Sequence, residues 1–118
     1  MRTGTISING KKHILCFSLR VMRQCAERYG SVSGLYDALS DADEKKSLDE
    51  AVWVLSAMMR AGDKYAKEND VGNEKAMTVE ELYDACDISD FFQIRASIVG
   101  TINNGRKTTV EVETPKNG

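Results

Sequence analysis

The stretch SLDEAVWVLSAMMRAGDKYAKE, residues 47–68, is the longest strongly patterned part of the chain. Apolar residues recur in it at steps of three and four, the spacing of one face of an α-helix. At about 100° per residue these positions span an arc of about 140°. The stretch predicts one helix with a broad buried face, against which shorter elements pack. The positions are Leu48, Ala51, Val52, Leu55, Met58, Met59, Gly62, Tyr65 and Ala66.

The totals favour a single globular domain. The chain has 118 residues, of which 42% are hydrophobic and 29% charged, and this length supports one modest core. No apolar run has the length of a membrane span, and the N-terminal residues lack the apolar region of a secretory signal. We therefore expect a cytoplasmic protein.

A β-hairpin is predicted at the N-terminus. Residues 5–8 alternate polar and apolar side chains, residues 12–15 resume an extended pattern, and Asn9-Gly10 lies between them. Asn-Gly tolerates the positive φ angles that a type I′ hairpin turn requires. A lone hairpin is marginally stable, so it must pack on another element, and the long helix is the obvious platform. His13 is expected to be a surface residue of this hairpin.

Two shorter helices are predicted between the hairpin and the long helix. Ser18 is a candidate N-cap of the first, and Gly30 is placed to end it. Ser31 or Ser33 starts the second. The first is expected to bury Leu19, Met22, Cys25, Ala26 and Tyr29, and the second Leu35, Tyr36 and Leu39.

The C-terminal third is predicted to contain two more helices. Residues 69–77 are polar and aperiodic, which indicates a mobile surface loop. Thr78 with Glu81 is a capping-box pair that starts a helix ending near residue 85. A last helix is expected at 90–103, followed by a tail with an extended segment at 108–112. The predicted fold is therefore α+β and mostly helical: an N-terminal β-hairpin packed on a small helical bundle with one long central helix. Residues 1–103 form this domain, and 104–118 form a flexible tail.

The sequence shows no catalytic, cofactor or metal constellation. There is one histidine, and the three cysteines lack zinc-finger or CxxC spacing, so we interpret Cys16, Cys25 and Cys86 as reduced core residues. The acids of residues 41–49 suggest a calcium loop, but Lys46 replaces its glycine and Val52 its bidentate glutamate. We expect a protein that is not an enzyme and has no cofactor.

Charge is unevenly distributed along the chain. Residues 1–30 hold six Lys/Arg and one acid, residues 31–94 hold six and fifteen, and residues 95–118 hold four and two. The pattern fits internal charge complementarity, and it also fits a basic surface for an anionic partner.

Three aromatic residues are candidate partner-binding residues. Trp53 lies on nearly the opposite side of the long helix from its apolar stripe, so either the hairpin or a short helix covers it, or it anchors a partner. Phe91 and Phe92 are adjacent and cannot both point inward along one narrow stripe. One of them is therefore expected to be exposed or to be buried in an oligomer.

The helix–break–helix of residues 78–103 also has the outline of a helix-turn-helix. Its second helix offers Arg95 as its only base, with Arg106 and Lys107 beyond its expected end. One base can make few contacts to the phosphates of DNA, so we do not expect nucleic acid to be the partner. A small DNA-binding regulator stays open as an alternative.

The order of these elements resembles that of tail assembly chaperones from long-tailed bacteriophages and prophages of Gram-positive bacteria. The likeness covers residues 5–103 and rests on the phrases ISINGKKHILCF, RQCAERYGS, GLYDAL, LDEAVWVLSAMMRAG and TVEELYD.

The resemblance implies a non-structural assembly factor of the infected host cytoplasm that is not present in the mature virion. Such a protein keeps the tape-measure protein soluble and recruits tail-tube subunits, and many members of the family self-associate. No motif of the family fixes the binding residues. A structural head–tail connector of the virion is the second alternative.

Overall fold

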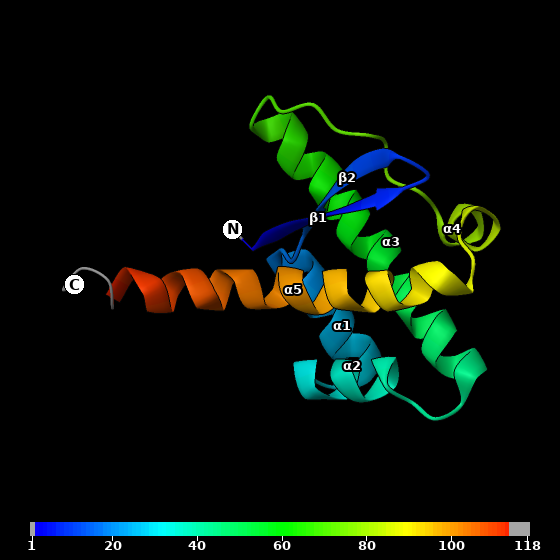
Figure 1. Ribbon diagram of the computed structural model, residues 1–118. Coiled ribbons are helices and arrows are strands. Elements are labelled where there is room, and N and C mark those ends of the chain that lie inside the picture. Colours follow the sequence, from blue (N-terminus) through cyan, green and yellow to red (C-terminus); the bar gives the residue numbers. More distant parts are fainter. Residues whose placement is uncertain (1, 114–118) are drawn as a thin grey trace.

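The structure is a computed structural model that describes the backbone of residues 2–113 and the side chains of residues 2–104. An N-terminal two-stranded hairpin is followed by five helices (Figure 1). The α+β prediction, with one long central helix, is confirmed. The elements are β1 (Thr3–Ile8), β2 (Lys11–Cys16), α1 (Leu19–Tyr29), α2 (Val32–Leu39), α3 (Glu44–Glu68), α4 (Val79–Ala85) and α5 (Ile88–Glu113).

The hairpin forms as the Asn-Gly signal predicts. Strands β1 and β2 pair antiparallel, with Thr3 opposite Cys16 and Ile8 opposite Lys11. Asn9 and Gly10 have φ angles of 52° and 79°, the left-handed conformation of a tight hairpin turn. Strand β2 lies against α3 and β1 lies against α5, so the hairpin is held between the two longest helices (Figure 1).

Helix α3 is buried more completely than its apolar stripe predicts. Every residue from 51 to 59 is buried except Trp53, which is half-buried. Val54, Ser56 and Ala57 lie outside the predicted stripe and are buried nonetheless. The reason is that the hairpin, α1, α2, α4 and α5 all pack on this helix. Its first residue is Glu44, three positions before the predicted start, and the side chain of Asp43 caps it.

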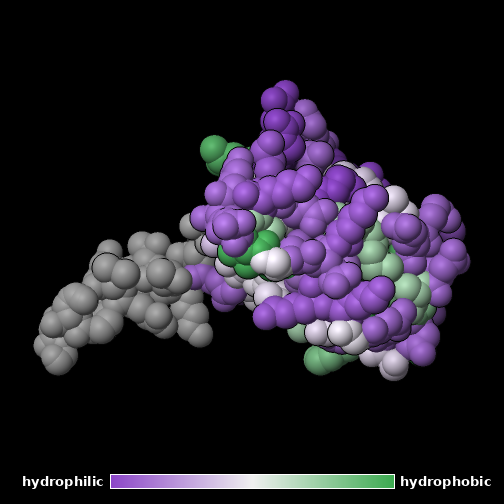
Figure 2. Space-filling model, turned by 90° about the horizontal axis from the view of Figure 1, so that it is seen from above, coloured by the Kyte–Doolittle hydropathy of each residue, from purple (hydrophilic) through white to green (hydrophobic). Residues whose placement is uncertain are grey.

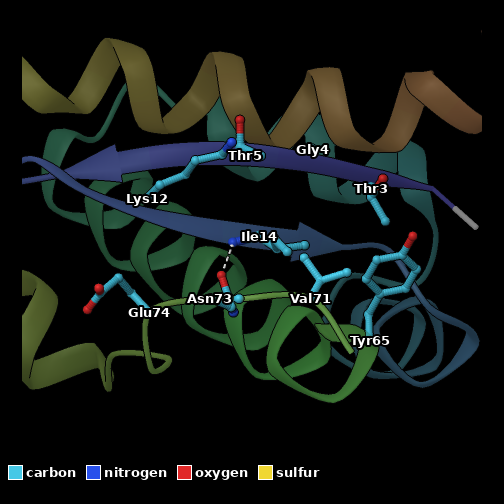
Figure 3. A pocket seen from close by; sticks show the side chains of 10 residues that line it. Thr3, Gly4, Thr5, Lys12, Ile14, Tyr65, Val71, Asn73 and Glu74 are labelled. Atoms are coloured by element: carbon cyan, nitrogen blue, oxygen red, sulfur yellow. Dashed lines mark hydrogen bonds between the residues drawn. The ribbon is translucent and has the colours of Figure 1, made fainter. Parts of the chain in front are cut away.

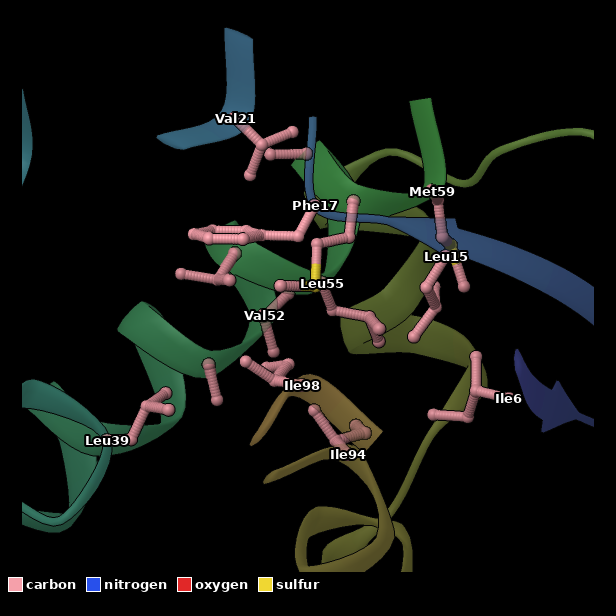
Figure 4. Close-up of a cluster of buried hydrophobic side chains, with 14 of the residues drawn as sticks. Ile6, Leu15, Phe17, Val21, Leu39, Val52, Leu55, Met59, Ile94 and Ile98 are labelled. Carbon is pink, nitrogen blue, oxygen red and sulfur yellow. The ribbon is translucent and has the colours of Figure 1, made fainter. Parts of the chain in front are cut away.

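The core lies where these elements meet, around the middle of α3 (Figure 4). Leu55 is fully buried there, with side chains from the hairpin, from α1 and α2, and from α5 around it. Figure 4 labels Ile6, Leu15, Phe17, Val21, Leu39, Val52, Leu55, Met59, Ile94 and Ile98. All three cysteines are free, with Cys16 and Cys25 buried and Cys86 half-buried, so the prediction of reduced core cysteines is confirmed.

The local signals for helix ends are confirmed. The side chains of Ser18 and Ser31 accept from the backbone N–H groups of the first turns of α1 and α2. Gly30 has a φ angle of 84°, the left-handed conformation that ends many helices. Thr78 and Glu81 form the complete capping box of α4.

The C-terminal helix differs from the prediction at both ends. Helix α5 begins at Ile88 instead of residue 90 and continues to Glu113. The prediction of an extended segment at 108–112 is therefore wrong, because the backbone there is helical. Asn and Gly lower helix stability, but they stop a helix only when the chain turns left-handed after it. Of the predicted flexible tail, residues 114–118 lie outside the described residues.

Three residues lie on the opposite side from that predicted: His13, Leu19 and Ala26, of which Ala26 was expected to be buried but is exposed on α1. His13 was expected at the surface but is only 3% exposed, because it pairs with Ile6 and shares the inner face of the hairpin with Leu15. Its Nδ1 has no hydrogen-bond partner among the described residues. Leu19 was expected to be buried but is 81% exposed, since α1 presents Val21 and Cys25 to the core instead.

Candidate protein-binding surface

Trp53 is covered by the C-terminal turn of α1. Its ring meets that of Tyr29 edge-to-face, with centroids 6.0 Å apart and planes at 82°. The guanidinium carbon of Arg28 lies 4.3 Å from the centroid of the Trp53 ring, a distance at which cation–π attraction contributes. Of the two alternatives for Trp53, the structure shows cover by a helix of its own domain. Partner binding through Trp53 stays a prediction.

The same turn of α1 is fastened to α3 through Glu50. The carboxylate Oε1 accepts from Arg28 Nε at 2.7 Å and from Tyr29 Oη at 2.7 Å. Burial acts to raise the pKa of Glu50, but the hydrogen bonds from Arg28 and Tyr29 outweigh it and lower that pKa. Burial and the Glu50 carboxylate together raise the pKa of Tyr29. Each group is paired in the charge state it holds at neutral pH, so this cluster stabilises the packing of α1 on α3.

The two adjacent phenylalanines of α5 point in different directions, as predicted. Phe91 is half-buried and packs against the core, and the guanidinium of Arg95 lies 5.0 Å from its ring centroid. Arg95 also donates from Nη1 to the Leu39 carbonyl at 3.1 Å. Phe92 is 74% exposed. A phenylalanine exposed to this degree on a folded domain is a candidate binding residue.

Phe92 borders an apolar hollow between α2 and α5. Phe92, Ala96 and Val99 recur at helical spacing along α5, and Tyr36 and Leu39 face them from the end of α2. The hollow has a volume of about 400 Å³, enough for one or two side chains of a partner. We call these five residues the Phe92 surface. Of the three residues named from the sequence, it contains Phe92 alone.

A second apolar hollow lies between α1 and the C-terminal half of α3, with a volume of about 410 Å³. Its apolar wall includes Leu19, Val21 and Ala61, and three bases stand around it. We call it the α1–α3 groove. Sequence reasoning missed it because it exists only where two helices cross, and the exposed Leu19 was assigned to the core. The bases are Arg20, Arg60 and Lys64.

A third hollow, between the hairpin and residues 71–74, is more polar (Figure 3). Asn73 lies beside Ile14 there, and its Oδ1 accepts from the Ile14 backbone N–H at 2.8 Å. Its Nδ2 donates to Asp63, and the other Asp63 oxygen accepts from the Ala76 backbone N–H, both at 2.8 Å. These polar groups hold the segment that joins α3 to α4. The predicted loop of residues 69–77 is therefore irregular, as expected, but it is anchored at Asn73 and Ala76.

Hydrophilic residues cover most of the face shown in Figure 2. On the face shown in Figure 2, hydrophobic residues form small patches separated by polar ones. Within the described part of the chain, no group of three or more His, Cys, Asp or Glu could hold a metal ion. No helix among the described residues combines the length and apolarity needed to cross a membrane.

The α4–α5 pair adds nothing to the DNA-binding alternative. Residues 78–94 contain five acids and no Lys or Arg, and the following base, Arg95, is engaged by Leu39 and Phe91. Phosphate contacts require accessible bases on such a unit. The described side chains of this helix pair therefore offer no site for a nucleic-acid backbone.

A comparison of the chain with protein families, characterised proteins and solved structures finds no match.

Proposed function

We propose that this protein is a tail assembly chaperone of a long-tailed bacteriophage or prophage. It would act in the host cytoplasm, keep the tape-measure protein soluble, recruit tail-tube subunits and be left out of the mature virion. The proposal rests on the resemblance in the order of elements, and on an exposed apolar surface suited to holding a partner. A tape-measure protein consists of long amphipathic helices, which a small domain can shield by the helix-in-groove mode.

The observation that carries the proposal is the exposure of Phe92 beside an apolar hollow. An exposed aromatic next to a hollow lets a partner helix bury the ring and place its own side chain in the hollow. Since Phe92 is 74% exposed and the core does not use it, its burial by a partner would contribute to binding.

Co-expression with the tape-measure and tail-tube proteins of the same genome tests the proposal. We expect both to be retained by a tag on this chain, and the tape measure to be soluble only in its presence. Phe92→Ala should weaken retention by at least about tenfold, the effect of truncating a central aromatic anchor. Val71→Ala is the matched control, because Val71 is an exposed apolar residue outside the Phe92 surface. Trp53→Ala and Phe91→Ala test the other two candidates.

Two outcomes would reject the proposal. One is that both partners are soluble alone and neither is retained. The other is that the protein is found in purified particles, which would favour the head–tail connector. The DNA-binding alternative would be supported by salt-dependent DNA binding that Arg95→Ala removes.

A further inference from the structure

The α1–α3 groove runs along the C-terminal half of α3 and has small side chains on its floor. The α3 residues that line it extend from Ala57 to Glu68, which is about three helical turns or about 16 Å. Ala57 and Ala61 lie one turn apart on α3, and Cys16 and Val21 line the groove beside them. These four floor residues are buried or half-buried. Because each alanine offers a single methyl group, the space between the two helices stays open here.

The dimensions of the groove favour a slender ligand. Its volume of about 410 Å³ lies at the lower end of the range for small-molecule sites, about 300–1,000 Å³. Spread over about 16 Å, this volume corresponds to a cross-section of about 25 Å², whereas an α-helix with its side chains is about 10 Å wide. An extended peptide would bring backbone N–H and C=O groups onto an apolar floor that offers them no partners. An alkyl chain is narrow enough and has no polar groups.

Positive charge surrounds the groove. Arg20, Arg60 and Lys64 line it and are exposed, and Glu68 is the single acid among its lining residues. Within the described part of the chain, no carboxylate lies within ion-pair distance of these three bases. The charge of the groove therefore favours a ligand with a negatively charged group.

Arg60 is held in place by the fold. Its Nη1 donates to Ser56 Oγ at 3.0 Å, and Ser56 Oγ donates to the Met77 carbonyl at 2.8 Å. Ser56 is only 1% exposed, so this support is rigid. Arginine has five N–H donors in a planar fork that matches the two oxygens of a carboxylate. The remaining donors of Arg60 can therefore bind a carboxylate at the edge of the apolar floor.

We propose that the α1–α3 groove binds a small anionic amphiphile, a straight alkyl chain that ends in a carboxylate. The chain lies on the floor beside Ala57 and Ala61, and the carboxylate accepts from Arg60 with Lys64 nearby. A neutral chain would leave the bases without a partner, and an inorganic anion would leave the floor in contact with water. The site uses no residue of the Phe92 surface, so the inference does not depend on the proposed function.

Titration of the isotopically labelled full chain with decanoate, followed by NMR, tests this site. At concentrations below those at which decanoate forms micelles, we expect saturable binding with a Kd below about 1 mM. The amides of Val21, Ala57 and Ala61 should shift, and that of Phe92 should not. Octanoate should bind about 10- to 20-fold more weakly, because each buried methylene contributes about fourfold to affinity. Decanol has the same chain without the charge and should bind at least about fivefold more weakly.

Two variants test the charge and the hollow separately. Arg60→Gln with Lys64→Gln removes two charges from the rim and should weaken decanoate binding at least about tenfold. Ala61→Leu keeps these charges but fills the hollow, and it should also weaken binding at least about tenfold, because the alkyl chain then stays in water. Lys11→Gln with Lys12→Gln is the matched control and should bind like the wild type, since both lysines are exposed and lie outside the groove.

The amide spectrum of each variant without ligand shows that it is folded. The proposal is overturned if the wild type does not bind decanoate in this range, if decanol binds as tightly, or if either groove variant binds like the wild type. It is also overturned if the shifts centre on Phe92, because the alkyl chain would then occupy the Phe92 surface.

Discussion

Gly62 lies where strand β2 crosses helix α3, and it controls how closely they approach. A Cβ atom at this position would overlap the carbonyl group of Ile14. Alanine improves helix propensity by about 1 kcal/mol, but here it would push the strand off the helix. We expect Gly62→Ala to lower the free energy of unfolding by about 1–3 kcal/mol, the usual cost of overpacking.

Urea denaturation of two separate variants, Gly62→Ala and Gly100→Ala, isolates the effect of the close approach of β2 to α3. Gly100 also lies in a helix, but a Cβ atom there meets nothing within 4 Å. Gly100→Ala should therefore stabilise the protein by about 0.5–1 kcal/mol through propensity alone. Equal changes in the free energy of unfolding for the two variants would contradict the close approach at Gly62.

Glu50 makes stability depend on pH. Its pKa is lowered in the folded state by Arg28 and Tyr29 against the opposing effect of burial. Its contribution is therefore complete above the ordinary glutamate pKa of about 4.3 and is lost as the pH falls below it. Glu50→Gln should cost about 1 kcal/mol at pH 7, because Arg28 is partly solvated and loses a partly screened interaction.

Thermal denaturation between pH 3 and pH 7, a window of about four units that contains this transition, measures the effect. The difference between wild type and Glu50→Gln should shrink as the pH falls. Glu27→Gln is the control, because Glu27 pairs with Arg23 at an exposed site. A difference that stays constant with pH would contradict the role of the carboxylate charge.

At the residue scale, the sequence predicted the direction of some side chains and failed for others. Phe91 and Phe92 had to diverge, because neighbours on a helix point about 100° apart. His13 shares the strand phase of Leu15, so the alternation rule could have placed it inside, but its polarity argued for the surface. Leu19 fits the apolar stripe of α1 but lies in its first turn. Only the position of α1 on α3 decided that Val21 is buried instead.

At the element scale, the segment between α3 and α4 depends on one carboxylate. Asp63 accepts from the Asn73 side chain and from the Ala76 backbone N–H, and Asn73 in turn caps the Ile14 N–H of β2. Asp63→Ala should release this segment. We expect amide exchange at Ile14 and Ala76 to become at least about tenfold faster, the effect of losing about 1.4 kcal/mol of local stability.

Hydrogen exchange followed by NMR resolves these amides individually. Amides in the middle of α3, such as that of Leu55, should keep their protection, because they open only with the whole core. If amide exchange becomes faster at both Ile14 and Leu55, Asp63 stabilises the whole fold and not only this segment. Asp70→Ala is the control, since Asp70 is an exposed acid of the same connection.

The elements themselves were largely predictable, and their limits depended on local chemistry. The Asn-Gly turn, the serine caps, Gly30 and the Thr78–Glu81 box are decided by a few neighbouring residues, so the sequence indicates them directly. The end of α5 is different. Asn103, Asn104 and Gly105 weaken a helix without ending it, and Asn104 Nδ2 donates to the Thr3 carbonyl, a tertiary contact that no local pattern contains.

At the scale of the whole molecule, the sequence could predict that α3 forms the centre but not which surfaces remain uncovered. The Phe92 surface depends on the end of α2 lying close to α5, and the α1–α3 groove depends on one helix crossing another. Both are properties of tertiary packing between residues far apart in sequence. Local periodicity therefore identified Phe92 as a candidate but not the hollow that it borders.

The Phe92 surface is separate from the core, and this separation leads to a final prediction. Phe92 is 74% exposed and Leu55 is fully buried in the same domain. Phe92→Ala should change the free energy of unfolding by no more than about 0.5 kcal/mol, whereas Leu55→Ala should cost about 2–5 kcal/mol through the cavity it leaves. Chemical denaturation measures both. If Phe92→Ala is as destabilising as Leu55→Ala, its ring stabilises the fold, and any loss of partner retention would reflect unfolding. If Phe92→Ala is stable and loses retention, the ring contributes to binding directly.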